Sequence, residues 1–130
     1  MTHDFKNFPE LTNSQMAFYY FDSPHKQIFE NFQAKVIRVI DGDTIRVMWD
    51  ERDFDFAVRL SDIDAPEMDS IGGIESKIWL KDKIEGREVE VLVDPRNRVE
   101  KWGRLLCGII SDGLNINDLS LIEGASLPFE

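Results

Sequence analysis

The sequence has little cysteine or histidine, and this limits the metal and redox sites that it can build. Cys107 is the single cysteine among 130 residues, so an internal disulfide and a cysteine-based zinc cage are excluded. It lies in the apolar run 105–110, which is typical of a buried thiol rather than a reactive one. The two histidines, His3 and His25, lie near the amino terminus, where we predict no chemical role for them.

Long apolar runs are also missing. No run approaches the ~20 residues that a membrane-spanning helix needs, and residues 1–10 lack a basic segment followed by an apolar one. We therefore expect no signal peptide and no membrane partner. The predicted location is the cytoplasm or a larger assembly such as a virion.

Positive charge is scarce, with 15 Lys and Arg against 25 Asp and Glu and a formal net charge of −10. Proteins that bind nucleic acid through its backbone draw affinity from lysine and arginine. A phosphate-binding role must therefore rest on a metal or on a local basic cluster. One such cluster is present in residues 95–104, with the basic residues Arg96, Arg98, Lys101 and Arg104.

Aromatic residues are concentrated in residues 1–33, which hold eight of the fourteen. We interpret this segment as an aromatic N-terminal arm, with a short helix that begins after residues 12–14 and continues to Phe21. Two readings are open: the arm packs on its own domain, or it docks on a protein partner. Clustered aromatic side chains are typical of interfaces, which favours the docking arm.

The rest of the chain, residues 34–130, alternates between strand-like and helical patterns. Residues 35–40 and 44–49 predict two strands joined by Asp41-Gly42-Asp43, and the Asp-Gly pair predicts a type I′ turn in which Gly42 supplies a positive φ. Residues 54–63 predict a third strand that ends before Pro66.

Two helices and two further strands follow. A helix is predicted over residues 74–85, with Ile74, Ile78, Leu80 and Ile84 on one apolar arc and Gly86 after its end. Trp79 lies off that arc, where a contact with the arm is one option. Residues 89–93 and 105–110 predict strands, and Asn115 is expected to cap a last helix. The predicted fold class is mainly β with two helices (α+β), an OB-type five-stranded Greek-key barrel.

Charged residues gather at the ends of the first three strands. The carboxylates of Asp43, Asp64 and Glu67 are of the type that hard cations such as Ca²⁺ prefer. Arg59 on the third strand presents a fork that matches phosphate oxygens. With Arg104 from the basic loop, this combination is what metal-assisted phosphodiester hydrolysis needs, because metal and guanidinium groups stabilise charge on the phosphoryl oxygens.

Three motifs carry a resemblance to a known family: VIDGDTIRV (39–47), FAVRLSDIDAPE (56–67) and EKWGRLLCGIISDG (100–113), followed by NINDLSLIEGAS (115–126). The chain resembles the thermonuclease family, the staphylococcal-nuclease-like domain. This resemblance implies a five-stranded OB-type barrel and a calcium-dependent endonuclease that cuts single-stranded DNA or RNA and leaves 3′-phosphate ends.

The resemblance also implies roles for individual residues. Asp43 and Asp64 match metal-binding aspartates, Ala65 matches a position that supplies a backbone carbonyl, and Asp41 matches an outer-shell acid. Glu67 matches the glutamate that orients or deprotonates water. The positions expected to contact the substrate are, for the scissile phosphate, Arg59 and Arg104, and, near the bound nucleotide, Lys101, with Arg96 and Arg98 added from the basic loop.

Four features depart from the family pattern. The sequence reaches Glu130 about where the family supplies tyrosines that flank the base, the loop after Glu67 is shorter, Asp62 adds a carboxylate, and the chain is acidic. The first hypothesis is an active nuclease. The alternative is an assembly or structural protein, for example of a phage particle, that uses a nuclease-like barrel and a docking arm. An OB domain that binds nucleic acid without hydrolysis fits least, since such domains rely on basic grooves.

Overall fold

The computed structural model describes residues 3–100 and 103–129. The main sheet has six strands, of which five are long: β1 (Phe32–Asp41), β2 (Thr44–Met48), β3 (Phe56–Leu60), β5 (Glu88–Leu92) and β6 (Leu105–Ser111). The short strands are β4 (Ile63–Asp64), β7 (Leu114–Asn115) and β8 (Leu127–Pro128). The helices are α1 (Met16–Tyr19), the 3-10 helix η1 (Tyr20–Asp22), α2 (Gly73–Ile84) and α3 (Ile116–Ile122).

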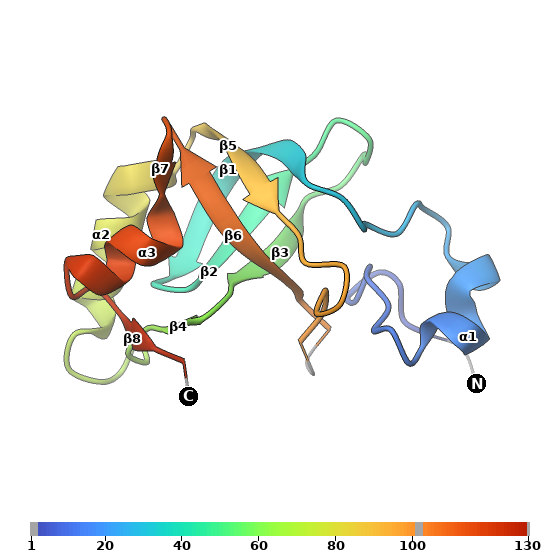
Figure 1. Cartoon of the computed structure of the whole chain (residues 1–130), viewed down its shortest axis with the longest axis horizontal. Helices are drawn as coiled ribbons and strands as arrows, with labels where there is room; N and C mark the ends of the chain where they lie inside the picture. Colours follow the sequence, from blue (N-terminus) through green and yellow to red (C-terminus); the bar gives the residue numbers. More distant parts are fainter. Residues whose placement is uncertain (1–2, 101–102, 130) are drawn as a thin grey trace.

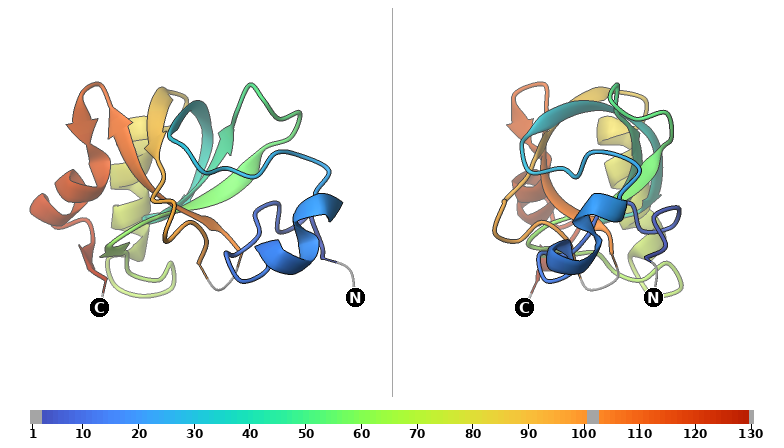
Figure 2. Two further views of the ribbon diagram at one scale, coloured as in Figure 1. Left: turned by 45° about the vertical axis from the view of Figure 1, so that its right-hand side comes forward. Right: turned by 90° about the vertical axis from the view of Figure 1, so that its right-hand side faces the viewer.

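The five long strands close into a barrel. Strand β1 pairs antiparallel with both β2 and β5, β2 pairs with β3, and β5 pairs with β6. The ring is closed by parallel pairing of β3 with β6, in which Arg59 lies opposite Leu106. Figure 2 shows the ring end-on. The predicted OB-type barrel and α+β class are confirmed.

Every second side chain along the barrel strands points inward and fills the core. Buried and partly exposed residues alternate along β3 and β6, as the period of two in a strand requires. The core includes Val36, Ile45, Leu60 and Ile109, each fully buried. Cys107 is also in this core, and burial raises the pKa of its thiol to about 12. The thiol therefore stays protonated and unreactive at neutral pH, as predicted.

The turn between β1 and β2 differs from the prediction. Gly42 is absent from the glycines with positive φ among the described residues, so a type I′ turn is wrong. A Cβ on Gly42 would lie 1.9 Å from Ser76 Oγ and 2.7 Å from Ala65 Cβ. Glycine is needed here because the turn is pressed against α2 and the chain after β4, so space rather than backbone conformation selects it.

Helix α2 lies where it was predicted, but it buries a different face. Its buried residues are Gly73, Ser76, Leu80 and Ile84, whereas Ile74 and Ile78 are 56% and 51% exposed. At 100° per residue these two isoleucines lie on another side of the helix from Leu80 and Ile84, so the predicted single arc is wrong. Trp79 contacts the carboxyl-terminal region rather than the arm, since its Nε1 donates to Glu123 Oε1 at 2.9 Å.

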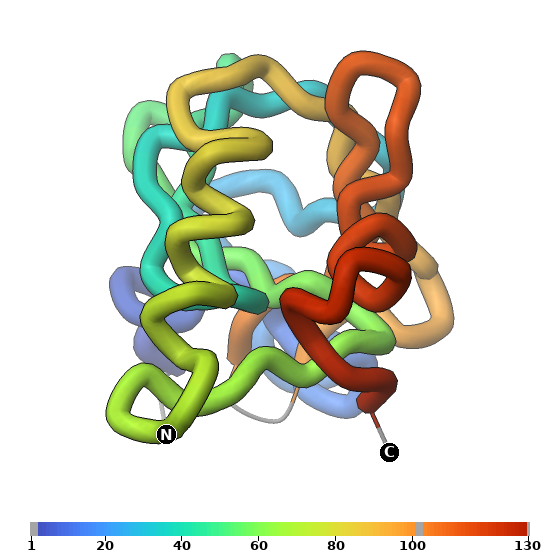
Figure 3. The backbone as a smooth tube through the Cα atoms, turned by 90° about the vertical axis from the view of Figure 1, so that its left-hand side faces the viewer, coloured from blue at the N-terminus to red at the C-terminus, as the bar shows by residue number. Residues whose placement is uncertain are grey.

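The last helix is capped as predicted. The Asn115 side chain accepts a hydrogen bond from the Asp118 N–H at 3.1 Å at the start of α3, and Gly124 follows the helix with φ of 75°. The chain then returns as β8, which pairs with β4. Figure 3 shows α2 and α3 side by side across this end of the barrel. No helix within residues 3–100 and 103–129 combines the length and apolarity needed to cross a membrane.

The arm lies at the other end of the barrel from α2 and α3 (Figure 1). It includes the short helix that was expected to continue to Phe21, as α1 followed by η1. Part of the arm packs on the barrel, because Glu10, Leu11, Gln27 and Ile28 are buried. Other arm side chains face solvent, with Phe18 78% and Phe21 97% exposed. The arm thus has a packed portion and an exposed aromatic portion, and its treatment as a unit separate from residues 34–130 stays a prediction.

Candidate active site

The turn after β1 places Asp43 at the centre of the charged residues. Its Oδ2 accepts a hydrogen bond from the Ala65 N–H at 3.0 Å, and its Oδ1 accepts from the Thr44 hydroxyl at 3.1 Å. The Asp43 N–H donates to Asp41 Oδ1 at 3.1 Å. The turn is also fixed to β3, because Leu60 N–H donates to the Asp43 carbonyl at 2.8 Å. Asp43 is therefore held by contacts to both neighbouring chain segments.

Arg59 joins the two carboxylates that were predicted as metal ligands. Its Nη2 lies 3.3 Å from Asp43 Oδ2 and 3.7 Å from Asp64 Oδ1. Its Nη1 donates to the carbonyls of Leu60 at 2.6 Å and Ile63 at 3.0 Å. The structure thus brings these three predicted residues together, and we call Asp43, Arg59 and Asp64 the acidic site. Two carboxylates converge on one guanidinium, which leaves the group with an excess negative charge.

Electrostatics at Asp43 favour an additional cation. The pKa of Asp43 is raised, first by burial and then by the hydrogen bond and charge of Asp41, while the Ala65 N–H and Arg59 oppose the rise. A raised pKa means that the surroundings disfavour the ionised carboxylate. A positive charge placed beside Asp41 and Asp43 would relieve that cost.

The carboxylates of Asp43 and Asp64 are of the type that a hard cation prefers, but the side chains alone do not complete a metal site. Within the described ranges, no group of three or more His, Cys, Asp or Glu residues is arranged to hold a metal. Calcium takes carboxylates together with backbone carbonyls and waters, so two aspartates are enough only as part of such a mixed shell. Asp64 is suited to this because its side chain is 60% exposed, and Asp43 because its carboxylate is desolvated.

Arg104 reaches the same turn from the position just before β6. Its Nη1 donates to Thr44 Oγ1 at 3.2 Å, and Thr44 in turn donates to Asp43. Glu100 grips the other side of the guanidinium through Nε at 3.0 Å and Nη2 at 3.2 Å. The pKa of Arg104 is raised, chiefly by its hydrogen bonds to Glu100. Both predicted phosphate-binding arginines therefore lie beside Asp43.

Glu67 follows the acidic site along the chain, on a loop packed against α2. A Cβ on Gly73 would lie 2.0 Å from the Glu67 carbonyl oxygen, and that oxygen accepts from the Ser70 N–H and hydroxyl at 2.9 and 2.8 Å. The backbone of Glu67 is thus fixed. Its side chain is exposed, and no hydrogen bond or ion pair holds its carboxylate within the described part of the chain.

The basic loop does not present its cations as a group. Arg98 was predicted to contact substrate, but its side chain is 0% exposed and lies 2.7 Å from Glu10 Oε2, so that prediction does not fit the structure. The physical reason is that Arg98 fills the junction of arm and barrel. Arg96 has a 94% exposed side chain, 3.9 Å from Asp94. Lys101 lies outside the described residues.

Three residues at the site escaped the sequence reasoning. Thr44 bridges Asp43 and Arg104, Glu100 aligns Arg104, and Phe129 stacks on Arg59 with its ring centroid 5.6 Å from Cζ. Glu100 has an opposite charge four residues before Arg104, a spacing that could have identified the pair. Phe129 reaches Arg59 because β8 pairs with β4, and no local pattern indicates that pairing.

A groove on another part of the surface lies apart from the acidic site. It has a volume of about 420 Å³ and lies between α3 and the outer face of β5 and β6. Its lining includes Asp62, Asp94 and Asp118, and none of Asp43, Arg59 or Arg104. Three acids would repel phosphate, so this groove is a poor site for nucleic acid. The additional carboxylate of Asp62 belongs to it.

Comparison with known proteins indicates a nuclease relationship. Over 101 residues the chain is 37% identical to an "Uncharacterized endonuclease" of Escherichia coli O157:H7, covering 77% of this chain and 63% of that protein. It is 34% identical over 104 residues to "Micrococcal nuclease" of Shigella flexneri, covering 72% and 56%. A match to "Protein ParB" of Escherichia coli has 39% identity over 74 residues and covers 57% and 39%.

The chain therefore spans less than two thirds of the length of these relatives. No protein-family model matches it. Two of the three relatives have nuclease names, which supports a nuclease family for this chain.

Proposed function

We propose that this protein is a metal-dependent nuclease that hydrolyses phosphodiester bonds, and that the acidic site with Arg104 is its catalytic centre. The observation that carries the proposal is the convergence of Asp43 and Asp64 on Arg59, with Arg104 linked to Asp43 through Thr44. The nuclease names of relatives with 37% and 34% identity support the same reaction class.

Asp43, Asp64 and the Ala65 carbonyl would hold Ca²⁺, with Asp41 in the outer shell. When bound, the ion would withdraw charge from a phosphoryl oxygen and assist ionisation of water. Arg59 and Arg104 would bind the phosphate and stabilise the charge that develops on its oxygens. Glu67, whose carboxylate is exposed, would orient the attacking water and accept its proton.

The proposed substrate is a flexible single strand of DNA or RNA, cut internally. Few cations are available to bind phosphate, because Arg98 is buried in an ion pair with Glu10. Affinity would come from the site arginines, from Arg96, whose side chain is 94% exposed, and from Lys101 rather than from a broad basic surface. Release of a 5′-hydroxyl and a 3′-phosphate is the product pattern proposed for this attack.

Digestion of labelled oligonucleotides tests the proposal. Single- and double-stranded DNA and RNA are incubated with wild type in Ca²⁺ or in chelator, and product ends are identified by phosphatase treatment. We expect calcium-dependent cutting of single strands to 3′-phosphates. Arg59→Ala and Arg104→Ala should each lower kcat by about 10²- to 10³-fold. Arg46→Ala is the matched control, because Arg46 pairs with Asp55 at 3.2 Å.

Two further variants test the remaining roles. Glu67→Gln should lose most of the activity while Asp69→Asn, its exposed neighbour, should not. Calcium should raise the Tm of wild type and not that of Asp64→Asn, because a ligand that binds only the folded state stabilises it. Wild type that shows no cutting, or Glu67→Gln and Arg59→Ala with full activity, would refute the proposal.

A second candidate role is docking by the arm, within a larger assembly such as a virion. The observation in its favour is the exposed aromatic portion of the arm, in which Phe18, Tyr20 and Phe21 are 78%, 49% and 97% exposed. Phe18→Ser/Phe21→Ser should leave digestion unchanged and abolish incorporation into the assembly. This double variant is a better test than deletion of the arm, because deletion would also remove Glu10. Normal incorporation of the variant would rule the role out.

A further inference from the structure

The arm contacts the barrel through one buried group of charges. Glu10 of the arm pairs with Arg98 of the basic loop at 2.7 Å and with Arg52, which lies between β2 and β3. The side chains of all three are at most 1% exposed. We call Glu10, Arg52 and Arg98 the arm clamp.

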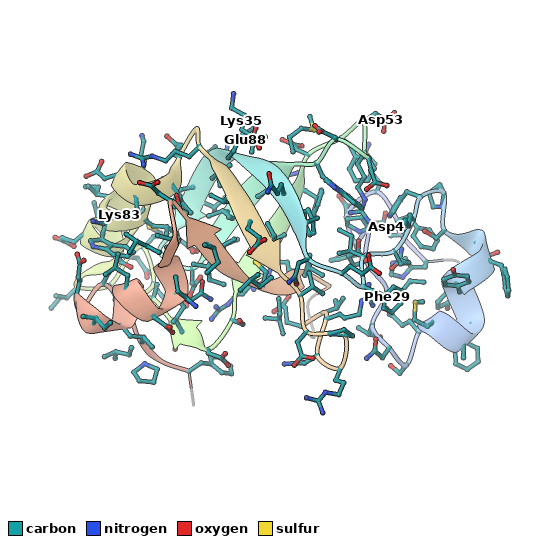
Figure 4. The ribbon with its side chains drawn as sticks, turned by 45° about the horizontal axis from the view of Figure 1, so that its top comes forward. Asp4, Phe29, Lys35, Asp53, Lys83 and Glu88 are labelled. Atoms are coloured by element: carbon teal, nitrogen blue, oxygen red, sulfur yellow. The ribbon has the colours of Figure 1, made fainter. Side chains whose placement is uncertain are left out.

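Arg98 binds more of the arm than its carboxylate. Its Nε donates to the Ile28 carbonyl at 2.5 Å and its Nη1 to the Leu11 carbonyl at 2.9 Å. Phe29 covers the guanidinium, with its ring centroid 4.1 Å from Cζ; Figure 4 labels Phe29 where the arm meets the barrel. Two separate arm segments, around Glu10 and around Ile28, therefore contact the side chain of Arg98.

The backbone of Arg98 is hydrogen-bonded to the chain that follows Arg104. The Leu106 N–H donates to the Arg98 carbonyl at 2.7 Å, and Val99 forms an isolated antiparallel bridge with Leu105. Glu100 N–H donates to the Arg104 carbonyl at 2.9 Å. Backbone contacts thus join residues 98–100 to residues 104–106.

The arm also touches this segment directly at its far side. A Cβ on Gly103 would lie 2.6 Å from Phe8 Cδ1, so the Phe8 ring packs on the residue before Arg104. Contacts from the arm therefore bracket the segment, at Arg98 through Glu10 and at Gly103 through Phe8.

We infer that the arm is a positioning element of the catalytic centre, and that Glu10 acts through Arg98 to fix the segment that presents Arg104 to Asp43. This inference rests on the proposed nuclease function. Glu10 and Arg98 touch no reacting group, so they are positioning residues. Small errors in the placement of a catalytic group lower the rate steeply, by up to about 10²-fold for about 1 Å.

Arg52 provides a matched control within the same clamp. Arg98→Met and Arg52→Met each remove one arginine and leave Glu10 paired with the other. Only Arg98 belongs to the segment that carries Arg104, whereas Arg52 stacks on Trp49, Phe54 and Phe56 at the opposite side of the clamp. A merely structural role predicts the same outcome for both variants.

The experiment measures kcat and KM on single-stranded DNA for wild type, both methionine variants and Arg104→Ala, below their melting temperatures and per folded molecule. We expect Arg98→Met to lower kcat by about tenfold with KM little changed, and Arg52→Met to keep kcat within about twofold. In the Arg104→Ala background Arg98→Met should have no further effect on kcat, because it acts through Arg104. Equal losses in the two methionine variants, or an additive loss in the Arg104→Ala background, would overturn the inference.

Hydrogen exchange gives a readout that does not depend on activity. Amides of residues 98–100 and 103–106 should exchange faster in Arg98→Met and not in Arg52→Met, and unchanged exchange in both would overturn the inference. If Arg98→Met does not fold, Arg98→Lys replaces it, because lysine keeps the charge but lacks the fork that reaches Leu11 and Ile28 together. Absence of cutting by wild type would refute the nuclease function alone, since exchange still tests the arm.

Discussion

The molecule contains two clusters of acid and arginine that are opposite in composition. At the acidic site two carboxylates, Asp43 and Asp64, share one arginine, Arg59. In the arm clamp two arginines share one carboxylate, Glu10, and none of the three side chains is more than 1% exposed. At the acidic site Asp64 is 60% exposed. The first cluster has excess negative charge and access to solvent, and the second has excess positive charge and none.

This difference distinguishes the charges of the arm clamp, which stabilise the fold, from those of the acidic site, which remain available to bind a ligand. Aromatic rings cover the excess positive charge of the arm clamp, since Arg52 lies over Phe56 at 4.6 Å and Arg98 over Phe29 at 4.1 Å. Such contacts partly replace the water that a buried cation loses. At the acidic site the pKa of Asp43 is raised, first by burial and then by Asp41, so Arg59 offsets only part of the cost of its negative charge. An unrelieved charge that faces solvent is a place for a ligand.

The largest effect on stability is expected from Glu10→Gln. Loss of the carboxylate leaves two buried guanidiniums without an anion, which costs about 3–5 kcal/mol when one partner of a buried pair is removed. Urea unfolding measures the change. Glu30→Gln, an exposed arm residue, is the control and should unfold like wild type. A loss below 1 kcal/mol for Glu10→Gln would mean that the two clusters do not differ in the way described.

Gly42→Ala should be the next largest, with a loss of about 1–3 kcal/mol from overpacking. The added Cβ would meet Ser76 Oγ at 1.9 Å, so the turn would have to move away from α2 and carry Asp43 with it. Gly108→Ala is the matched control, because its nearest contact is an ordinary 3.5 Å to Leu92. Equal unfolding midpoints for the two alanine variants would show that the turn is not fixed by packing.

Asp43→Asn should stabilise the protein at pH 7 by about 1 kcal/mol, the usual size of a favourable single substitution. Because the folded-state pKa of Asp43 is raised, the folded state holds this proton more tightly than the unfolded chain does. Stability therefore falls as pH rises through the interval from the ordinary Asp pKa up to the raised one. The amide has no charge to relieve and should escape that loss.

The pH dependence is the decisive part of the Asp43 measurement. Melting curves of wild type and Asp43→Asn should differ at pH 7 and converge as the pH falls below about 4, where the wild-type carboxyl is protonated in both states. Activity should be lost in the variant at every pH. A variant less stable than wild type at pH 7 would contradict the expected relief.

Asp64→Asn should have the smallest effect on stability, within about 0.5 kcal/mol, because an exposed ion pair contributes little. Its contact with Arg59 is 3.7 Å and its side chain is 60% exposed. The same substitution should nevertheless abolish the calcium-induced rise in Tm. The pair of results would set Asp64 apart from Glu10, although each is a carboxylate beside an arginine.

The fold could be predicted largely from local patterns. Alternation along β3 and β6, the glycine after α2 and the Asn115 cap all operate within a few residues of the chain, and each lies where it was expected. The meeting of Asp43, Asp64 and Arg59 was also predictable, since a short hairpin and one further strand bring them together. Their proposed roles, and that of Glu67, stay predictions.

Contacts between distant segments could not be predicted in the same way. Arg98 read as a solvent-facing cation because its partner, Glu10, lies 88 residues away. Gly42 read as a turn residue of a particular type because the sequence does not show that Ser76 and Ala65 would crowd it. The same local composition can occur in an exposed loop and in a buried ion-pair cluster, and only the tertiary contacts distinguish the two.

The parallel pairing of β3 with β6 has a consequence for how the protein becomes competent during folding. Arg59 lies in β3 and Arg104 immediately precedes β6, and these two strands are distant in the chain and adjacent only where the barrel closes. Closing a long loop is slow compared with forming a hairpin. A nascent chain that has formed only β1, β2 and β3 has Asp43 and Arg59 but no Arg104. Closure of the barrel therefore has to precede any joint action of Asp43, Arg59 and Arg104, because these three charges come together only in the finished fold.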